Sequence, residues 1–267
     1  MDCLTEEFEP IYINSVEVER NLAFSPEPPK YYILENQSWV PYAKDDVKLR
    51  LRVAGFNDQP DRQNGEVASD VDRALVEIQQ RRKIDVAMAL AGWPRGILTT
   101  KDGQKVLITE GAKKLEGEDV PFDRFYNYVE GLFGKKALPY FIGWLQWARL
   151  NIGIPEILPG QVPFFIGPKG AGKSLLQTYI TQLLGGRDND IYEFMKGQTF
   201  NEDAFEAAHL MIEDKFFEGG KAKSREFGSA LKQIAVNHTH RCPPKYKKAF
   251  KATPKWRMTV SMNDEEE

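Results

Sequence analysis

Apolar and polar residues alternate along this chain with the periods of both strands and helices. Two pairs of short apolar runs, each separated by turn residues, predict β-hairpins over residues 31–40 and 96–109. Apolar positions between residues 44 and 54 fit either a strand or one face of a helix. Helical spacing, with Asp70 as the expected N-cap of the first helix, predicts helices over residues 70–82, 84–90, 121–134, 139–150, 175–184 and 224–236.

The same pattern divides the chain into three parts. Residues 1–29 contain several prolines and acids and are interpreted as a tail or linker, with one short strand at residues 11–16. Residues 30–155 are expected to form a mainly helical α+β domain with small hairpins. Residues 156–267 follow a connection rich in proline and glycine, and are expected to form an α/β core. A length of 267 residues fits two domains.

Aromatic side chains are concentrated on the two helices predicted between residues 121 and 150. Base stacking is one interpretation of this stripe, but its helical spacing favours a packed core. The residues are Phe122, Phe125, Tyr126, Tyr128, Tyr140, Phe141, Trp144 and Trp147.

Composition excludes several classes of protein. Hydrophobic residues make up 42% and charged residues 28%, which is typical of a globular protein and excludes global disorder. The chain has no apolar run of about 18 residues, so we expect no membrane partner. The acidic N-terminus does not resemble a signal peptide. Cys3 and Cys242 form no CxxC or disulfide pattern, which favours the cytoplasm.

Charge is distributed unevenly along the chain. The segment from Lys221 to Arg257 contains eleven Lys or Arg and one acid, a net charge of +10, so the rest of the chain carries −13 of the total of −3. A basic segment in an otherwise acidic chain indicates a nucleic-acid contact. The alternative is a solvated, lysine-rich face.

A phosphate-binding motif follows the apolar run at residues 162–166. The sequence GPKGAGKS at residues 167–174 matches GxxxxGK[ST] without deviation. Its glycines allow backbone N–H groups to surround a phosphate, and the helix that follows adds partial positive charge. Lys173 is expected to contact the β- and γ-phosphates of ATP, and Ser174 to bind Mg²⁺. The predicted nucleotide-binding residues are Gly167, Pro168, Lys169, Gly170, Ala171, Gly172, Lys173, Ser174 and Leu175.

Two further strands are expected to end in catalytic side chains. A strand over residues 207–212 leads into Glu213 and Asp214, which suit a metal shell and a general base. The sequence does not assign the two roles between them, although Asp214 is the expected contact to Mg²⁺. A third strand, residues 256–263, ends at Asn263, which is expected to orient water and sense the γ-phosphate. His209 is interpreted as a histidine hydrogen-bonded within the core.

The order of these motifs resembles that of the superfamily 3 helicases. GPKGAGKS, then IED, then a basic segment, then WRMTVSMN lie within residues 167–263, in the order of motifs A, B, B′ and C. The match is most similar to the primase-associated helicases of phages, satellite phages and poxvirus-like DNA viruses. The sequence FNED at residues 200–203 also resembles the family, and residues upstream resemble its helical, winged-helix-like domain.

The resemblance implies an α/β P-loop NTPase core of AAA+ type that assembles as a homo-hexamer. Such a protein hydrolyses ATP with Mg²⁺, translocates on single-stranded DNA in phage or mobile-element replication, and lies in the cytoplasm of a bacterial host. Carried over by position, the catalytic residues are Lys173, Glu213, Asp214 and Asn263. A primase or replication-initiation protein is an implied partner.

The basic segment would supply the family's pore hairpin, which falls between Lys232 and Lys251. Prolines 243 and 244 favour a projecting turn, and basic charge with an interleaved tyrosine suits single-stranded DNA. His238, His240 and Cys242 could instead form part of a metal site, although three ligands are few. The expected DNA-binding residues are His240, Arg241, Lys245, Lys247 and Lys248.

Two departures from the family leave other functions open. The chain has no primase domain, and it stops four residues after Asn263, where the family continues with a strand and an arginine finger. We therefore expect a core that is incomplete at its C-terminus. One alternative is a P-loop ATPase that loads or remodels a replication protein without unwinding DNA. Another is a non-catalytic nucleotide- or DNA-binding partner of a separate primase.

Overall fold

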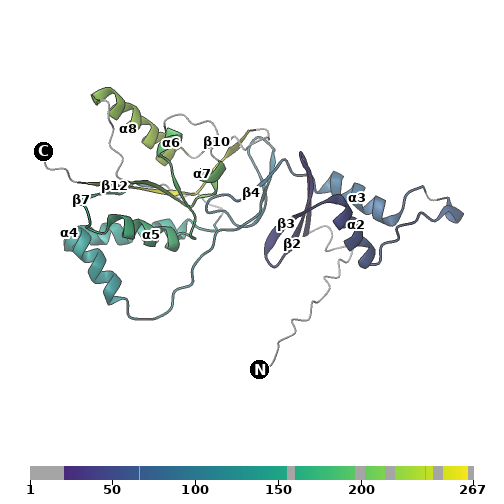
Figure 1. The fold of residues 1–267 in the computed structure, drawn as a ribbon, viewed down its shortest axis with the longest axis horizontal. Helices are drawn as coiled ribbons and strands as arrows, with labels where there is room; N and C mark the ends of the chain where they lie inside the picture. The colour runs from purple at the N-terminus through teal and green to yellow at the C-terminus, as the bar shows by residue number, and fades with distance from the viewer. Residues whose placement is uncertain are drawn as a thin grey trace. The chain divides into compact units, whose positions relative to one another are not determined.

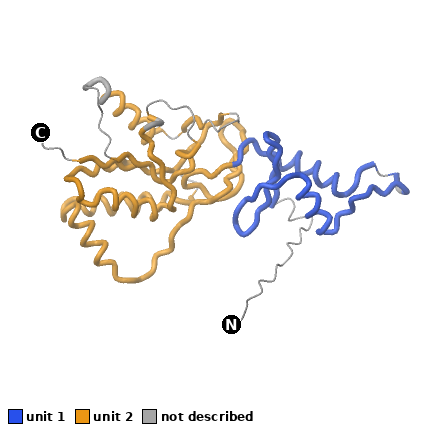
Figure 2. Tube along the Cα trace, viewed as in Figure 1, with its two compact units in different colours: residues 1–87 blue, residues 88–267 orange. Residues whose placement is uncertain are grey.

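The computed structural model describes residues 21–65, 67–154, 160–195, 202–213, 220–237, 239–242 and 249–263. The chain forms two compact units, residues 1–87 and 88–267 (Figure 2). Its elements are β1 (Leu22–Pro26), β2 (Pro29–Glu35), β3 (Ser38–Tyr42), α2 (Lys44–Val53), η1 (Arg62–Asn64), α3 (Asp70–Arg81), β4 (Val86–Met88), β5 (Gly96–Thr99), β6 (Lys105–Ile108), α4 (Asp123–Leu150), β7 (Phe164–Gly167), α5 (Lys173–Leu183), β8 (Asp188–Asp190), α6 (Tyr192–Met195), α7 (Glu202–Glu206), β9 (His209–Glu213), α8 (Gly220–Val236), β10 (His240–Cys242), β11 (Phe250–Ala252) and β12 (Arg257–Asn263).

The first unit is a small α+β fold built on an antiparallel sheet of order β1-β2-β3. The β2–β3 turn is tight, because Asn36 and Gln37 both adopt positive φ. Helices α2 and α3 bury Val47, Leu51 and Leu75 in one core with residues of the sheet. The hairpin predicted over residues 31–40 is confirmed, and residues 44–54 are mostly helix.

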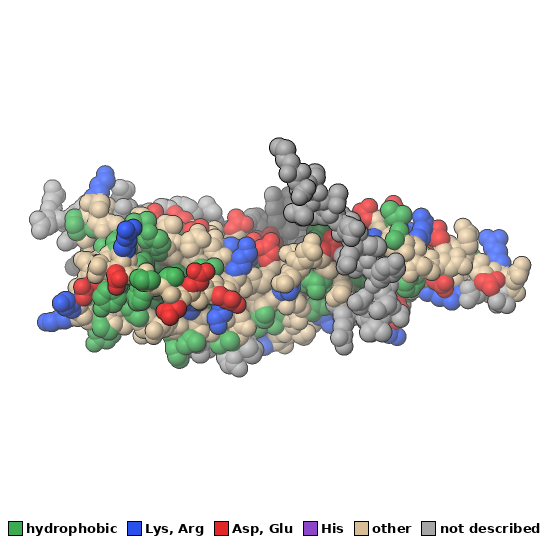
Figure 3. Space-filling model, turned by 90° about the horizontal axis from the view of Figure 1, so that it is seen from below, with side chains coloured by type: hydrophobic (Ala, Val, Ile, Leu, Met, Phe, Trp, Pro, Cys, Tyr) green, Lys and Arg blue, Asp and Glu red, His purple; other side chains and the backbone are tan. Residues whose placement is uncertain are grey.

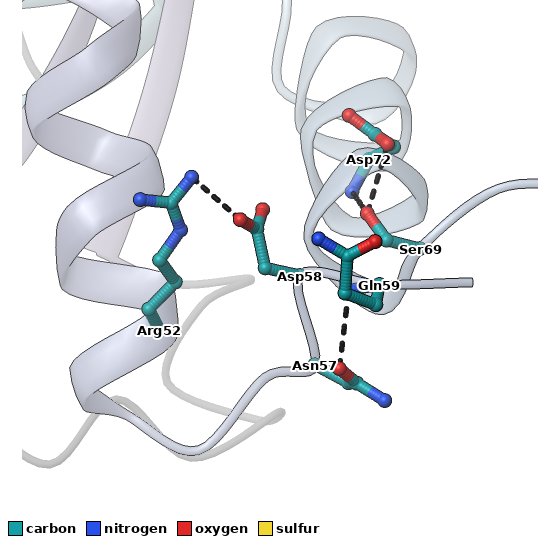
Figure 4. Close-up of polar contacts among 6 residues, drawn as sticks. All are labelled: Arg52, Asn57, Asp58, Gln59, Ser69 and Asp72. Atoms are coloured by element: carbon teal, nitrogen blue, oxygen red, sulfur yellow. Dashed lines mark hydrogen bonds and ion pairs between the residues drawn. The ribbon is translucent and has the colours of Figure 1, made fainter. Parts of the chain in front are cut away.

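Polar contacts tie the segment between α2 and α3 to the two helices (Figure 4). Arg52 on α2 forms an ion pair with Asp58 at 2.7 Å, and Asn57 accepts a hydrogen bond from the backbone N–H of Gln59. Ser69 caps α3, since its hydroxyl accepts from the backbone N–H of Asp72 at 3.1 Å. The expected cap, Asp70, is instead the first residue of the helix.

Two other expectations for this part of the chain need correction. Strand β1 lies within the segment interpreted as a tail, where its partner β2 supplies the pairing that a single short strand cannot show in sequence. The helix expected over residues 84–90 is instead strand β4, which joins a three-stranded sheet of order β4-β6-β5. A buried run this short carries no periodicity that separates helix from strand. The strand expected at residues 11–16 lies outside the described residues.

The second unit contains a parallel four-stranded sheet of order β7-β12-β9-β8. Strand β12, the last in sequence, is therefore inserted between β7 and β9. Figure 1 shows α4 and α5 on one side of this sheet and α6, α7 and α8 on the other. A parallel sheet with helices on both faces and several small antiparallel sheets makes the protein a mixed α/β fold.

Helix α4 belongs to the same core as the parallel sheet. It bends at Gly134, where φ is 69°, so the two helices predicted here are both present on either side of a kink. Phe141 and Trp144 pack with Phe165 of β7 and Leu176 of α5 in one buried cluster. The boundary between the two compact units lies after residue 87, whereas the sequence predicts a domain boundary after residue 155. The two differ because this packing joins α4 to the α/β core.

The aromatic stripe on α4 is only partly buried. Phe141 and Trp144 are core residues, but Tyr140 is 81% exposed and Trp147 is 45% exposed. Figure 3 shows hydrophobic side chains among charged ones on the face of the second unit where α4 and α5 lie. Among the residues that the structure describes, no helix combines the length and apolar character needed to cross a membrane.

Candidate functional site

The motif GPKGAGKS forms the loop that joins β7 to α5. Gly170 and Gly172 have φ of 84° and 98°, a left-handed conformation that glycine adopts without steric cost. Gly172 is also the N-cap of α5, whose first N–H groups have no acceptor within the helix. Residues 168–171, together with Ser174 and Leu175, are exposed. The loop therefore leads directly into the N–H groups of a helix N-terminus, which is the geometry of an anion site.

Lys173 is the buried cation of this loop. Its side chain is 9% exposed, and its Nζ donates to Gly167 O at 2.8 Å, Pro168 O at 2.9 Å and Asn263 Oδ1 at 3.0 Å. Three oxygen acceptors match the three donors of an ammonium group. They offset the cost of removing the charge from water, which amounts to several kcal/mol for an unpaired ion.

The sheet register aligns the expected catalytic residues along one edge. Asn263 of β12 is paired with Gly167 of β7, and Ser261, two residues earlier, is paired with Glu213 of β9. All three strands are parallel, so their carboxyl ends meet at the same edge of the sheet. Glu213 is exposed there. Asp214 lies outside the described residues.

Tyr128 of α4 closes the other side of the loop. Its hydroxyl donates to the carbonyl oxygen of Gly172 at 2.7 Å, and burial raises its pKa above the usual range. A cavity of about 470 Å³ lies beside this contact. It is lined by Tyr128, Gly131, Leu132, Phe133, Phe164, Phe165, Ile166, Gly167, Pro168, Ala171, Lys173 and Leu176. Aromatic and aliphatic groups next to phosphate-binding donors suit a ligand with an apolar ring and an anionic tail.

A buried polar network holds α5, the helix that follows the phosphate loop, against the sheet. His209 of β9 is 0% exposed, and its Nδ1 and Nε2 lie 2.8 Å from Thr181 Oγ1 and 2.9 Å from Thr259 Oγ1. Gln177 of α5 donates to the same Thr259 hydroxyl at 2.9 Å. Burial lowers the pKa of His209 to about 3, so the ring is neutral. The interpretation of His209 as a hydrogen-bonded core residue is confirmed, and the network joins α5, β9 and β12.

The residues present fit a nucleotide better than a directly held metal ion. The loop donors and Lys173 suit phosphates, and Ser174 is accessible at the first turn of α5. Across the part of the chain that the structure describes, no three His, Cys, Asp or Glu side chains gather to hold a metal. Magnesium would accordingly be held through phosphate oxygens together with Ser174.

The alternative metal group in the basic segment gains little from the geometry. His238 lies outside the described residues, and Cys242 is fully buried, with its thiol pKa raised to about 12 by burial. His240 lies over Trp256, with ring centroids 5.0 Å apart, and burial lowers its pKa. A neutral His240 cannot serve as a phosphate-binding cation near neutral pH.

The basic segment is less exposed than its sequence indicates. Lys255 and Arg257 are each 4% exposed, and Lys255 Nζ donates to the carbonyl of Ile154. Burial lowers the pKa of Arg257 to about 10. Both cations therefore belong to the core and do not add to a surface charge. Of the expected DNA-binding residues, Arg241 is exposed, while Lys245, Lys247 and Lys248 lie outside the described residues.

Sequence reasoning missed the groups that hold the loop in place. Tyr128 was interpreted only as part of the aromatic stripe, and nothing in its local pattern indicates a contact 44 residues away. Gln177 and Thr259 interrupt apolar runs in α5 and β12, and this interruption is the feature of the sequence that indicates a buried polar contact. A polar residue inside a buried helix face indicates a hydrogen-bonded core position.

Comparison with known proteins gives a fold but no function. A family model described as a family of unknown function (DUF5906) matches residues 165–267, less than half of the chain. No curated protein matches. The apo structure of the NrS-1 C terminal region (305-718) is similar over 97% of this chain and 58% of that chain, with 17% identity and a TM-score of 0.59.

A second solved structure, the A form apo structure of the NrS-1 C terminal region, agrees. It is similar over 91% of this chain and 53% of that chain, with 16% identity and a TM-score of 0.57. The chain spans a little over half the length of these solved structures. At this level of identity the likeness establishes a shared fold, and it extends across both units of the chain.

Proposed function

We propose that this protein is an ATP-dependent DNA helicase module of superfamily 3 that acts in phage or mobile-element replication. The observation that carries the proposal is the strand order β7-β12-β9-β8. Insertion of β12 beside the phosphate loop brings Asn263 to within 3.0 Å of Lys173. The motif order in the sequence supplies the link to superfamily 3, and the likeness to the NrS-1 C terminal region is consistent with it.

Each side chain has a role in hydrolysis that its position supports. The loop N–H groups and Lys173 bind the phosphates of ATP and stabilise charge that develops on transfer. Asn263, hydrogen-bonded to Lys173, orients the attacking water, and Glu213 at the end of β9 accepts its proton. Bound Mg²⁺ neutralises phosphate charge. Homo-hexamer assembly, with single-stranded DNA in the pore, is part of the same proposal.

The test uses the full chain with a fluorescent ATP analogue, followed by hydrolysis with and without single-stranded DNA. Glu213→Gln should retain nucleotide binding and lose at least about 100-fold in hydrolysis. Glu116→Gln, an exposed acid in the loop before α4, is the matched control and should change neither. Normal turnover in Glu213→Gln would remove this residue from the mechanism.

The effect of DNA separates the proposal from its alternatives. Stimulation of hydrolysis by single-stranded DNA, together with strand separation, supports a helicase. Hydrolysis that DNA leaves unchanged favours an ATPase that loads or remodels a replication protein. ATP binding without hydrolysis at every protein concentration favours a non-catalytic partner of a separate primase.

A further inference from the structure

A second cavity of the α/β unit lies far from the phosphate loop in sequence. Its volume is about 650 Å³, and its walls come from the β5–β6 turn and from the two-stranded β10–β11 sheet. We call it the strand groove and define it by six of its lining residues: Trp93, Thr100, Lys101, Asp102, Arg241 and Lys251.

The groove concentrates positive charge from two separate segments. Lys101, Arg241 and Lys251 are all exposed, and Asp102 is the acid among the lining residues. These four side chains give the groove a net charge of +2. Lys101 and Asp102 come from a part of the sequence outside the basic segment, so charge counting along the chain does not reveal them.

The pairing of β10 with β11 places two of these cations close together, and their repulsion destabilises the small sheet. Arg241 is directly opposite Lys251 in the antiparallel register. Like charges at such a position destabilise a sheet, and a two-stranded sheet is marginal by itself. Asp102 relieves part of the repulsion through an ion pair with Lys251 at 3.4 Å, but both side chains are about half exposed. A surface pair of this kind is weak and is easily exchanged for another anion.

The β5–β6 turn holds its side of the groove in a fixed shape. Thr100 N donates to Gln104 O at 2.8 Å, and Gly103 N donates to Thr100 O at 2.9 Å. The Thr100 hydroxyl also accepts from Gln104 N at 3.1 Å. The backbone that carries Lys101 and Asp102 is therefore ordered before any ligand arrives, which reduces the entropic cost of binding.

An aromatic side chain lies in the same groove. Trp93 donates from Nε1 to Thr253 O at 2.6 Å, and Lys255 Nζ lies 4.3 Å from its ring centroid. The ammonium occupies one face of the indole, and the half-buried Trp93 is one of the groove's lining residues. A base that stacks on an indole gains affinity that does not depend on the base sequence.

We propose that the strand groove binds the backbone of single-stranded DNA, with Lys101 and Lys251 as phosphate contacts beside Arg241. This proposal rests on the proposed function and extends it, because it adds the β5–β6 turn to the DNA path. Asp102 acts in the opposite sense: it competes with phosphate for Lys251 and weakens binding. Cations on both walls and an aromatic ring among the lining residues match an anionic chain of bases.

The test measures binding of a fluorescein-labelled oligothymidylate to the full chain, without nucleotide, at several salt concentrations. Lys101→Ala with Lys251→Ala should flatten the slope of log K against log salt by up to about 1.4, at about 0.7 for each phosphate contact. Asp102→Asn should bind more tightly than the wild type. Lys135→Ala with Lys136→Ala, an equal charge change on the exposed face of α4, should leave the slope unchanged.

Other outcomes separate the groove from the proposed function. An unchanged slope in the Lys101/Lys251 double variant, with a flattened slope in Arg241→Ala, overturns the groove and leaves the DNA contact of β10. A wild-type chain that does not bind the oligonucleotide overturns both, whereas ATP binding that depends on Lys173 would stand independently. Cross-linking of a 5-bromouracil oligonucleotide to Trp93 supports the groove without any variant, and its absence with efficient cross-linking elsewhere contradicts it.

Discussion

The phosphate loop and the strand groove are both proposed to bind an anionic ligand through cations, but they hold those cations in opposite ways. Lys173 is buried and donates to three oxygens, two of them backbone carbonyls. Lys101, Arg241 and Lys251 are exposed, and two of them repel each other across a two-stranded sheet. Salt screens exposed charges strongly and buried charges much less. The buried lysine of the phosphate loop therefore suits a ligand of one defined geometry, whereas the exposed cations suit the proposed contact to DNA of any sequence.

Replacing Lys173 should have the largest effect and should show this contrast most clearly. Lys173→Ala removes the cation that is proposed to contact the β- and γ-phosphates of ATP. Hydrolysis should therefore fall at least about 100-fold, and ATP binding should weaken strongly. The loss should be the same at low and high salt. Lys114→Ala, an exposed cation in the loop before α4, is the control and should leave both hydrolysis and ATP binding unchanged.

Asn263 tests whether the edge of β12 belongs to the same site. Asn263→Ala removes the side-chain acceptor of Lys173, and hydrolysis should fall about 10- to 100-fold while the Kd for the ATP analogue changes little. Asn189→Ala on the outer strand β8 serves as the matched control. Equal losses in the two variants would mean that the sheet edge is disturbed as a whole.

His209 tests whether the loop is supported by a neutral, buried network. Its pKa is about 3 in the folded chain and near 6.5 when unfolded, so the unfolded state binds the extra proton between these values. The contribution of neutral His209 to the free energy of unfolding is fully present above pH 6.5 and is lost as pH falls toward 3, at about 1.4 kcal/mol per pH unit. Urea unfolding of the wild type and of His209→Asn should show this slope only in the wild type.

Tyr128 should give the smallest effect. Tyr128→Phe removes one hydrogen bond to Gly172 O, worth about 1 kcal/mol, and should weaken binding of the ATP analogue about five-fold. Tyr126→Phe, which changes an exposed ring two residues earlier on α4, should bind the ATP analogue normally. DNA binding at the strand groove should be unchanged in both variants, which would separate the two surfaces experimentally.

The sequence was most informative where a pattern is local. The phosphate loop, the hairpins and the strand that ends at Asn263 all follow from contiguous residues, and each is present in the fold. The expectations that failed depend on partners distant in sequence. Strand β1 needs β2, and the short run at Val86–Met88 becomes a strand because β6 lies beside it.

The charge counted along the sequence was a poor guide to the charge that the folded protein exposes. Counting along the chain gave Lys255 and Arg257 the same weight as Arg241, although both are buried. It also overlooked Lys101, which the fold brings to the same groove from residues far upstream. A charge count records which side chains exist, whereas their use depends on packing that only the tertiary structure determines.

The segment that leads from the strand groove into β12 has a mechanical consequence. Lys255 N donates to Ala91 O, and Gly92 lies so close that a Cβ there would come within 2.6 Å of Lys255 Cβ. The chain is thus clamped at one end, and β12 then runs straight for seven residues, about 23 Å, to Asn263. An extended strand bonded on both edges resists stretching. Under the proposed function, a displacement of β11 that breaks this contact would be transmitted along β12 to Asn263, at the site proposed for hydrolysis.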